Sequence, residues 1–228
     1  MRQIIDGVFE LRLGFVNVHL AVIDDGVVLI DTGLPGRRAA LRIESALHDV
    51  HRTVGAVTHI LLTHKHPDHT GGVAELRRRS GARVVAHEAD APVITGAEAL
   101  VLEPVQRIGA IFIPMPEPSP VDDLLTGDSA VPIAGFRAVH TCPGHTPGHV
   151  SYLLERDGVV LFAGDAASGG GGKVRRTPRM LTDDVAAAQA SVARLAELEF
   201  EVAVFGHGSA VRDRAVDRFR ELAAADSR

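Results

Sequence analysis

The sequence predicts a layered α/β fold that forms one domain over residues 1–228. Short apolar runs typical of buried strands alternate with segments of helical character in both halves of the chain. Apolar residues make up 46% of the chain and charged residues 23%, which excludes a disordered protein because such a composition builds an ordinary core. No apolar run approaches the roughly 20 residues that a membrane helix needs, so we expect no membrane partner.

In the first half of the chain, several strands alternate with two helices. Asp24-Asp25-Gly26 is a turn signal between two apolar runs, so it marks the turn between two strands. Gly72 precedes a helical segment of about two turns that ends near Gly81. The other expected elements are strands over residues 16–23, 27–30, 57–63 and 83–86 and a helix over residues 38–50.

The second half repeats this alternation. Asp157-Gly158 predicts a turn that pairs the apolar runs on either side of it. Asp183 and Asp184 suit the first turn of a long helix that we expect to begin at Thr182, because their charges oppose the positive end of the helix dipole. The remaining expected elements are strands over residues 136–141, 150–154, 159–163 and 202–205 and a last helix over residues 214–225.

Two segments interrupt the alternation. Residues 92–120 are rich in proline and carry Ile111, Phe112 and Met115, which predicts a lid, or a homodimer contact if these side chains form an exposed patch. Residues 168–179 contain a run of glycines followed by basic residues, which predicts a binding loop or a pocket wall. For each segment, a plain surface excursion is the alternative.

Charge and cysteine content narrow the partners and the compartment. Lys and Arg number 24 against 29 Asp and Glu, so the formal charge is −5 and no nucleic-acid partner is expected. Cys142 is the single cysteine, so no disulfide can form within the chain. The first residues show no export signal, and together these observations predict a cytoplasmic protein.

The strongest functional signal is His64-Lys65-His66-Pro67-Asp68-His69, which follows an apolar strand. If the chain is extended through His64 and His66, the two side chains point the same way and can clasp one ion. Pro67 then turns the chain, so that Asp68 and His69 face a second point close by. Imidazole nitrogen and carboxylate oxygen are ligands that zinc accepts, as do iron and manganese. The segment therefore predicts a metal site; the alternative is a polar loop that happens to hold three histidines.

Three further candidate ligands each follow a predicted strand. They are His145, Asp165 and His207. In a layered α/β domain, the ends of strands can converge on one edge, which is where such folds place ligands. Singly, each signal is weak, because a Gly-Asp pair is often a turn and a histidine after a strand is often structural. Together with residues 64–69 they offer two ions a full set of protein ligands.

These motifs, with Asp31-Thr32-Gly33 after an earlier strand, resemble the metallo-β-lactamase superfamily of metal-dependent hydrolases, in its glyoxalase II and lactonase-like branch. The resemblance runs from that strand through His207 and implies a four-layer αββα sandwich with the metals at one edge of the sheets. It further implies that His64, His66 and His145 hold a first metal, that Asp68, His69 and His207 hold a second, that Asp165 bridges the two, and that Asp31 orients the ligand loop.

The implied cofactor is two Zn²⁺ per chain, with iron or manganese as alternatives. Paired metals lower the pKa of a shared water and polarise a carbonyl, so no Ser, Cys or Lys nucleophile is needed. Asp68 is the candidate catalytic residue because its carboxylate can accept the proton of that water. His149 is expected either to orient Asp165 or another ligand, or to be an ordinary structural histidine.

The sequence thus predicts a dinuclear zinc hydrolase whose metal-bridging hydroxide attacks a small ester, thioester, lactone or amide. Its partner is a small-molecule substrate, and Lys173, Arg175 and Arg176 are expected to contact an acidic group on it. The alternatives are a mononuclear iron oxidoreductase of the persulfide dioxygenase type, a β-lactam-hydrolysing enzyme of the same fold, and a non-catalytic domain that uses the sheets as a scaffold.

Overall fold

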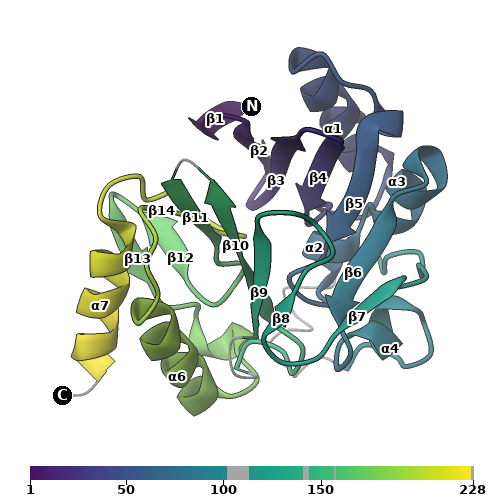
Figure 1. Ribbon diagram of the computed structural model, residues 1–228. Coiled ribbons are helices and arrows are strands. Elements are labelled where there is room, and N and C mark those ends of the chain that lie inside the picture. The colour runs from purple at the N-terminus through teal and green to yellow at the C-terminus, as the bar shows by residue number, and fades with distance from the viewer. Residues whose placement is uncertain (102–112, 141–143, 157, 227–228) are drawn as a thin grey trace. The chain divides into compact units, whose positions relative to one another are not determined.

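The computed structural model describes residues 1–101, 113–140, 144–156 and 158–226 (Figure 1). Within it the chain divides into two compact units, residues 1–124 and residues 125–228. Each unit combines β-sheet with helices, as the predicted α/β class requires. The prediction of a single domain over the whole chain stays a prediction.

Unit 1 is built on a seven-stranded sheet in which strand order follows chain order. Its first four strands form antiparallel pairs, whereas β4, β5 and β6 are parallel neighbours. The parallel arrangement matters because β4 and β5 then end at the same edge, where the residues after both strands come together. The strands are β1 (Arg2–Ile5), β2 (Val8–Leu13), β3 (Val16–Ile23), β4 (Gly26–Ile30), β5 (Val57–Leu61), β6 (Arg83–His87) and β7 (Asp123–Leu125).

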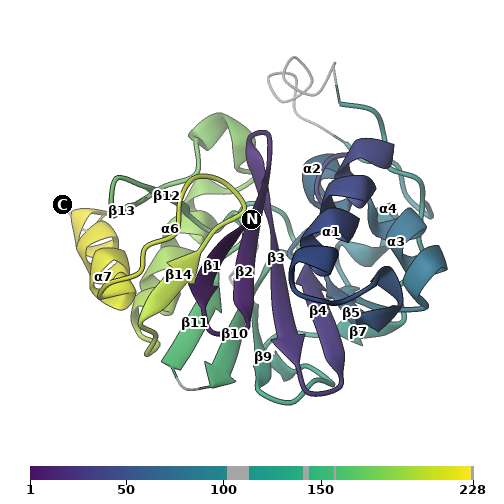
Figure 2. The same ribbon diagram turned by 90° about the horizontal axis from the view of Figure 1, so that it is seen from above.

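Two helices cover one face of this sheet, α1 (Arg37–Asp49) and α3 (Val73–Ser80) (Figure 2). Ala40, Ile43 and Leu47 lie on one face of α1 and are fully buried in the same apolar cluster as Leu20 and Leu29 of the sheet. Helix α3 ends at Gly81, as predicted, since this residue takes the left-handed conformation with φ 75°. Short helices η1 (Val54–Ala56), α2 (Pro67–Thr70) and α4 (Ala91–Ile94) fill connections in this unit.

Unit 2 holds a five-stranded sheet in the order β14-β11-β10-β9-β8. The pairing of β10 with β11 is antiparallel, as the Asp157-Gly158 signal predicts, although Asp157 itself lies outside the described residues. Strand β14 joins β11 in parallel. The strands are β8 (Ser129–Ala130), β9 (Phe136–His140), β10 (Val150–Arg156), β11 (Gly158–Phe162) and β14 (Val202–Val204).

The helices of unit 2 are α6 (Val185–Ala196) and α7 (Ala215–Asp226), which lie side by side in both overall views (Figures 1 and 2). Val192 and Leu195 of α6 and Phe219 of α7 are buried with Leu161 and Ala203 of the sheet. The prediction that the helix begins at Thr182 is wrong. Asp184 caps the helix by accepting a hydrogen bond from Ala187 N at 3.0 Å, and Thr182 follows the short helix η2 (Arg179–Leu181).

The two interrupting segments differ from one another. Residues 168–179 include a hairpin of β12 (Ser168–Gly170) and β13 (Lys173–Arg175), so the first part of this predicted loop is regular structure. Of residues 92–120, positions 102–112 lie outside the described residues, and with them Ile111 and Phe112. The described ends meet where Ser119 N donates to Ile94 O at 3.0 Å, and Met115 is 62% exposed. The lid and dimer interpretations stay predictions.

Among the described residues, no helix combines the length and apolar character that crossing a bilayer requires.

Candidate functional site

The histidine-rich segment of unit 1 lies between the end of β5 and the start of α2. His66 is extended, with φ −65° and ψ 147°, and Pro67 occupies the first turn of α2, so the chain turns where the sequence predicts. His64 and His69 are buried, whereas His66 and Asp68 are half-buried. The four candidate ligands of this unit therefore come from one short segment with a defined backbone.

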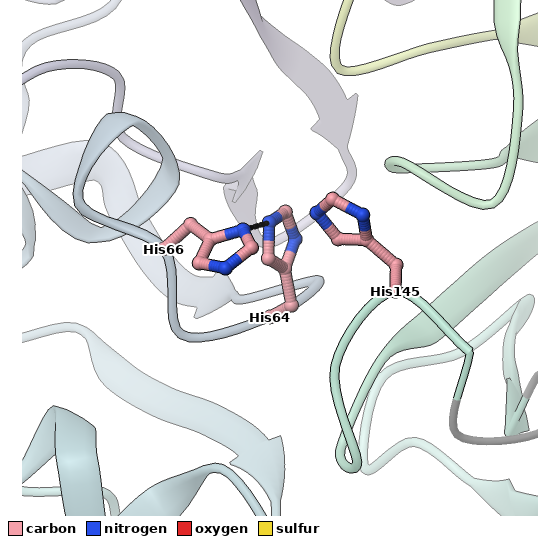
Figure 3. A group of neighbouring side chains, drawn as sticks. All are labelled: His64, His66 and His145. Atoms are coloured by element: carbon pink, nitrogen blue, oxygen red, sulfur yellow. Dashed lines mark hydrogen bonds between the residues drawn. The ribbon is translucent and has the colours of Figure 1, made fainter. Parts of the chain in front are cut away.

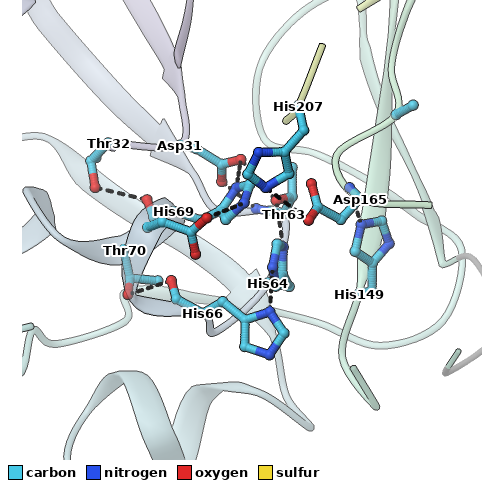
Figure 4. Close-up of polar contacts among 12 residues, drawn as sticks. Asp31, Thr32, Thr63, His64, His66, His69, Thr70, His149, Asp165 and His207 are labelled. Carbon is cyan, nitrogen blue, oxygen red and sulfur yellow. Dashed lines mark hydrogen bonds and ion pairs between the residues drawn. The ribbon is translucent and has the colours of Figure 1, made fainter. Parts of the chain in front are cut away.

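Asp31 is the hydrogen-bond centre of this segment (Figure 4). It follows β4, is 2% exposed and adopts a positive φ of 61°. Its Oδ1 accepts from Thr63 N at 2.8 Å, and its Oδ2 accepts from Thr63 Oγ1 and from His69 Nδ1, each at 2.8 Å. Strand β5 ends at Leu61 rather than at Thr63, since the Thr63 amide bonds this carboxylate instead of a neighbouring strand.

These bonds fix which ring nitrogens carry protons. His69 donates Nδ1–H to Asp31, so its Nε2 presents a lone pair. The single hydroxyl proton of Thr63 goes to Asp31, so Thr63 Oγ1 accepts from His64 Nδ1 at 3.0 Å. His64 Nε2 then also presents a lone pair and lies 3.0 Å from His66 Nδ1 (Figure 3).

The donor set of unit 1 fits a divalent metal. His69 Nε2 lies 3.6 Å from Asp68 Oδ2, and ligand atoms of His64 and His69 lie within 4.8 Å of one another. Ligands placed about 2.0–2.2 Å from a tetrahedral ion are roughly 3.3 Å apart, which is close to the 3.0 and 3.6 Å separations found here. Neutral imidazoles oriented by a buried carboxylate are the ligands that zinc prefers.

Asp90 supports the same segment and was missed in the sequence. It is 1% exposed, and its Oδ2 accepts from Lys65 N at 3.0 Å while its Oδ1 lies 3.7 Å from Lys65 Nζ. Asp90 thus holds the backbone between His64 and His66. The one signal in the sequence was that Asp90 follows β6. Strand β6 is the parallel neighbour of β5 and ends at the same edge, so a residue after it lies near the histidine-rich segment.

In unit 2, one carboxylate oxygen lies between two imidazoles. Asp165 Oδ2 is 3.4 Å from His145 Nε2 and 3.2 Å from His207 Nε2. Asp165 is 5% exposed and His145 is 4% exposed, whereas the His207 side chain is 30% exposed. The three candidate ligands of this unit are therefore brought together, with separations that again suit ligands of a metal.

Contacts to its backbone hold Asp165 in place. The Asp165 amide donates to His149 Nε2 at 2.9 Å (Figure 4), and Thr177 Oγ1 donates to Asp165 O at 2.6 Å. His149, which is 1% exposed, thus contacts the backbone of Asp165. Its Nε2 is an acceptor, so its proton is on Nδ1.

Strand β12 holds the His207 loop. Gly169 N donates to His207 O at 3.3 Å, and Ser209 N donates to Gly169 O at 2.9 Å. Gly208 has φ 93°, and a Cβ atom there would collide with Gly169 O, so glycine is required on both counts. The glycine-rich segment therefore serves as a clamp on a candidate ligand loop.

A cavity of 320 Å³ opens beside Asp165 within unit 2. Arg176 lines it, whereas Lys173 and Arg175 are not among its described lining residues. That these three residues contact a substrate stays a prediction. Arg179 and Gln189 line it and were missed, because their nearness to Asp165 depends on the turn after β13 and on the packing of α6. The lining residues are His145, His149, Asp165, Ala166, Arg176, Thr177, Arg179, Thr182, Val185, Ala188, Gln189, Ser191 and Val192.

The predicted site residues thus form two groups, one in each unit. Asp31, His64, His66, Asp68 and His69 gather in unit 1. His145, His149, Asp165 and His207 gather in unit 2. Cys142 lies outside the described residues. That the two groups serve the same pair of ions stays a prediction.

Comparison with known proteins places this chain among metallo-hydrolases. A family model described as the metallo-beta-lactamase superfamily matches residues 11–207. The probable metallo-hydrolase YflN of Bacillus subtilis (strain 168) is 29% identical over 227 residues, which cover 89% of this chain and 84% of that protein. A hydroxyacylglutathione hydrolase of Halorhodospira halophila is 37% identical over 140 residues, which cover 60% of this chain and 41% of that protein.

Solved structures agree with the predicted fold class. A metallo-beta-lactamase family protein from Thermus thermophilus superimposes with a TM-score of 0.74 and 28% identity over 99% of this chain and 81% of that one. The predicted α/β sandwich class of the metallo-β-lactamase type is therefore confirmed. The seventh candidate ligand, His207, is the last residue that the family model matches.

Proposed function

The chain belongs to the metallo-beta-lactamase superfamily and is a metallo-hydrolase, and on this premise we propose that it cleaves a small ester, thioester, lactone or amide with two zinc ions. The name of the relative from Halorhodospira halophila denotes hydrolysis of an acyl group from glutathione, which supports an acyl substrate. The chain spans 41% of that relative, so glutathione itself is not part of the proposal.

We propose that the ligands of the two units combine around one pair of ions. His64, His66 and His145 would hold the first ion, Asp68, His69 and His207 the second, and Asp165 would bridge them. The observation that carries this proposal is the position of Asp165 Oδ2, at 3.2 and 3.4 Å from Nε2 atoms of two histidines. Imidazole and carboxylate ligands favour zinc, and also suit iron or manganese.

When bound, such ions supply a Lewis acid for the substrate carbonyl and lower the pKa of water near them. The chain's own residues prepare the ligands for this task. Asp31 keeps a proton on His69 Nδ1, and through Thr63 Oγ1 it keeps another on His64 Nδ1, so both Nε2 atoms present lone pairs. Metal binding at these two nitrogens then requires no change of tautomer.

Asp68 is the proposed proton acceptor. Its side chain is 14% exposed, and Oδ2 faces His69 Nε2 at 3.6 Å, so the carboxylate lies beside the ligand group while remaining within reach of water. A carboxylate in this position can hold the proton released by an attacking water and return it to the leaving group. His149 would orient Asp165 through the hydrogen bond to its backbone amide.

The test uses the full-length protein loaded with zinc. Elemental analysis is expected to find two zinc ions per chain, and a panel of small esters, thioesters, lactones, amides and β-lactams is expected to include at least one hydrolysed acyl substrate. Removal of zinc with a chelator should abolish hydrolysis, and added zinc should restore it. Failure to hydrolyse any member of the panel would overturn the proposal, as would one iron per chain with oxygen consumption on a persulfide.

A further inference from the structure

We propose that His140 is a positioning residue for the candidate metal ligand His145. His140 is the last residue of β9 and comes shortly before His145 along the chain. Its ring contacts the backbone that follows His145, and its own backbone is held by an ion pair. This inference rests on the proposed function, in which His145 holds a zinc ion, and it adds a residue on which the affinity for that ion depends.

The first observation is the contact between the His140 ring and the loop that carries His145, residues 144–147. His140 Nε2 lies 3.2 Å from Pro147 O. A carbonyl oxygen only accepts, so Nε2 carries a proton and donates it to this oxygen. Because Pro147 comes two residues after His145, the bond ties the end of β9 to the far side of the ligand loop.

The near side of the same loop is held by α6. Gly144 O accepts from Asp184 N at 2.8 Å, and a Cβ atom on Gly144 would collide with Ala188 N and Cα. The loop backbone therefore packs directly on the start of α6, which only glycine allows. His145, which is 4% exposed, thus lies between two anchored carbonyl groups, Gly144 O and Pro147 O.

An ion pair holds the backbone of His140. His140 N donates to Asp128 Oδ1 at 2.8 Å, and Arg194 Nη1 donates to His140 O at 2.6 Å. Arg194 Nη2 donates in turn to Asp128 Oδ2. Asp128 immediately precedes β8, and Arg194 lies in the last turn of α6. One carboxylate and one guanidinium therefore fix both polar backbone groups of the residue whose ring contacts the ligand loop.

The size of the expected effects favours a role in positioning over a role in stability. The side chains of Arg194 and Asp128 are 38% and 42% exposed, and ion pairs with such exposure add little to the free energy of unfolding. Residues that orient a ligand without touching the metal, in contrast, change metal affinity by roughly 10–100-fold. We therefore expect the loss of the His140 ring to affect metal binding more than it affects folding.

The test measures the zinc affinity of the full-length protein by competition with a chromophoric chelator. His140→Leu removes the donor, and we expect the affinity for at least one ion to fall roughly 10–100-fold. His140→Gln keeps an N–H donor near the position of Nε2 and should restore the affinity to within about threefold of the parent value. The visible spectrum of the cobalt-substituted protein should change in His140→Leu and return in His140→Gln. His48→Leu, at an exposed position of α1, is the matched control and should keep the parent affinity and spectrum.

A double-mutant cycle tests whether His140 acts through His145. In a His145→Ala background, adding His140→Leu should change the remaining zinc affinity by less than about twofold, because the side chain that it positions is gone. An equal loss with and without His145 overturns the proposal, as does parent-like affinity in His140→Leu or affinity in His140→Gln as weak as that of His140→Leu. If His140→Leu does not fold, Arg194→Met replaces it, because this change releases the backbone of His140 and leaves its ring intact. Unchanged zinc affinity in Arg194→Met then overturns the proposal.

Hydrolysis separates this inference from the proposed function. Zinc affinity that depends on His140 only while His145 is present, in a protein that hydrolyses none of the acyl substrates, overturns the proposed function and leaves the positioning role intact. Hydrolysis by a protein whose zinc affinity is independent of His140 overturns the positioning role and leaves the proposed function intact. A parent protein that binds no zinc overturns both.

Discussion

The two groups of candidate ligands are organised in different ways. In unit 1, His64, His66, Asp68 and His69 come from one short segment, and a single carboxylate, Asp31, orients His69 directly and His64 through Thr63. In unit 2, His145, Asp165 and His207 come from three separate loops, each held by backbone contacts made elsewhere.

This contrast explains why one group is visible as a motif and the other is not. A contiguous segment carries its own spacing, so strand and turn geometry is enough to predict which side chains share a side. A group assembled from loops depends on sheet topology and on glycines that let two backbones approach. We therefore expect metal binding by the ligands of unit 1 to depend mainly on Asp31. Metal binding by the ligands of unit 2 should depend on each of the separate contacts that hold their loops.

The largest effect is expected from Asp165→Asn, which removes the charge of the carboxylate whose Oδ2 lies close to both His145 and His207. We expect kcat/KM to fall roughly 1,000-fold or more, since metal ions supply several kcal/mol of transition-state stabilisation. Metal content should fall by at least one ion per chain, as measured by elemental analysis. Asp183→Asn, an exposed neighbour of the α6 cap, is the matched control. Full metal content and activity in Asp165→Asn would remove the bridging role.

Asp31→Asn tests the hub of unit 1. Asparagine tolerates the positive φ of this position, so the backbone is preserved. Its amide nitrogen would face a donor, Thr63 or His69, in place of the oxygen that now accepts from it. We expect a loss of roughly 2–4 kcal/mol in unfolding free energy by urea denaturation and a 10–100-fold weaker zinc affinity.

Asp25→Asn, in an exposed turn of the same unit, provides the control for Asp31→Asn. It should change neither stability nor zinc affinity. If Asp31→Asn kept the zinc affinity of the parent protein while losing stability, Asp31 would be a packing residue rather than an orienting one.

Gly208→Ala tests the contact between β12 and the His207 loop against Gly171→Ala, at a position that also has a positive φ but is open. Gly208 and Gly171 both have positive φ, but a Cβ on Gly208 collides with Gly169 O while a Cβ on Gly171 meets nothing within 4 Å. We expect Gly208→Ala to cost about 2 kcal/mol more than Gly171→Ala in urea unfolding, and to weaken zinc binding. Equal effects of the two substitutions would show that φ strain alone matters and that β12 does not hold the His207 loop.

A smaller effect is expected from Asp90→Ala, which frees the backbone between two ligands while touching neither. We expect zinc affinity to fall by up to about tenfold, at the low end of the range for residues that orient ligands. Asp90→Asn keeps an acceptor for Lys65 N and should recover most of the affinity. Lys65→Met removes only the ammonium group and should have little effect, so a loss as large as that of Asp90→Ala would assign the role to the ion pair instead.

Much of the fold follows from the sequence because its elements are marked locally. Apolar runs and Asp-Gly turns predict the strands that flank the ligands, and Gly81 predicts the end of α3. The start of α6 was misplaced because Thr182 and Asp184 are both good caps, and only tertiary contact selects between them: Asp184 N donates to Gly144 O. The β12–β13 hairpin was not predicted, since a run of glycines suggests a loop. In the structure Gly169 allows a close backbone approach, and Gly171 and Gly172 supply the positive φ of the turn.

The candidate site divides in the same way. All four candidate ligands of unit 1 could be assigned from spacing, and those of unit 2 from their places after strands with the help of a family resemblance. Asp90 and Arg179 could not be found, because a buried acid after β6 and a basic residue in a turn are common features without chemistry. Their roles come from neighbours that are distant along the chain.

Glu10 offers a control for effects of global stability on the ligands of unit 1. Glu10 is 8% exposed on β2, with Oε1 at 2.9 Å from Arg2 Nη2 and Oε2 at 3.8 Å from His19 Nε2. Burial by itself raises the pKa of Glu10, but the nearby His19 imidazole and the Arg2 guanidinium, which donates a hydrogen bond to this carboxylate, outweigh it, so the pKa lies below its ordinary value of 4.5.

A lowered carboxyl pKa stabilises the folded state above the unfolded pKa, and this contribution is lost as the pH falls through the folded pKa. We therefore expect Glu10→Gln to reduce the unfolding free energy by about 1 kcal/mol at pH 7 and by less at pH 3, as measured by urea denaturation. Zinc affinity at pH 7 should stay unchanged, since Glu10 contacts none of residues 64–69 in the described bonds. If Glu10→Gln weakened zinc binding as much as Asp31→Asn does, the effect of Asp31→Asn would reflect global stability. Asp31 would then not act by orienting His64 and His69.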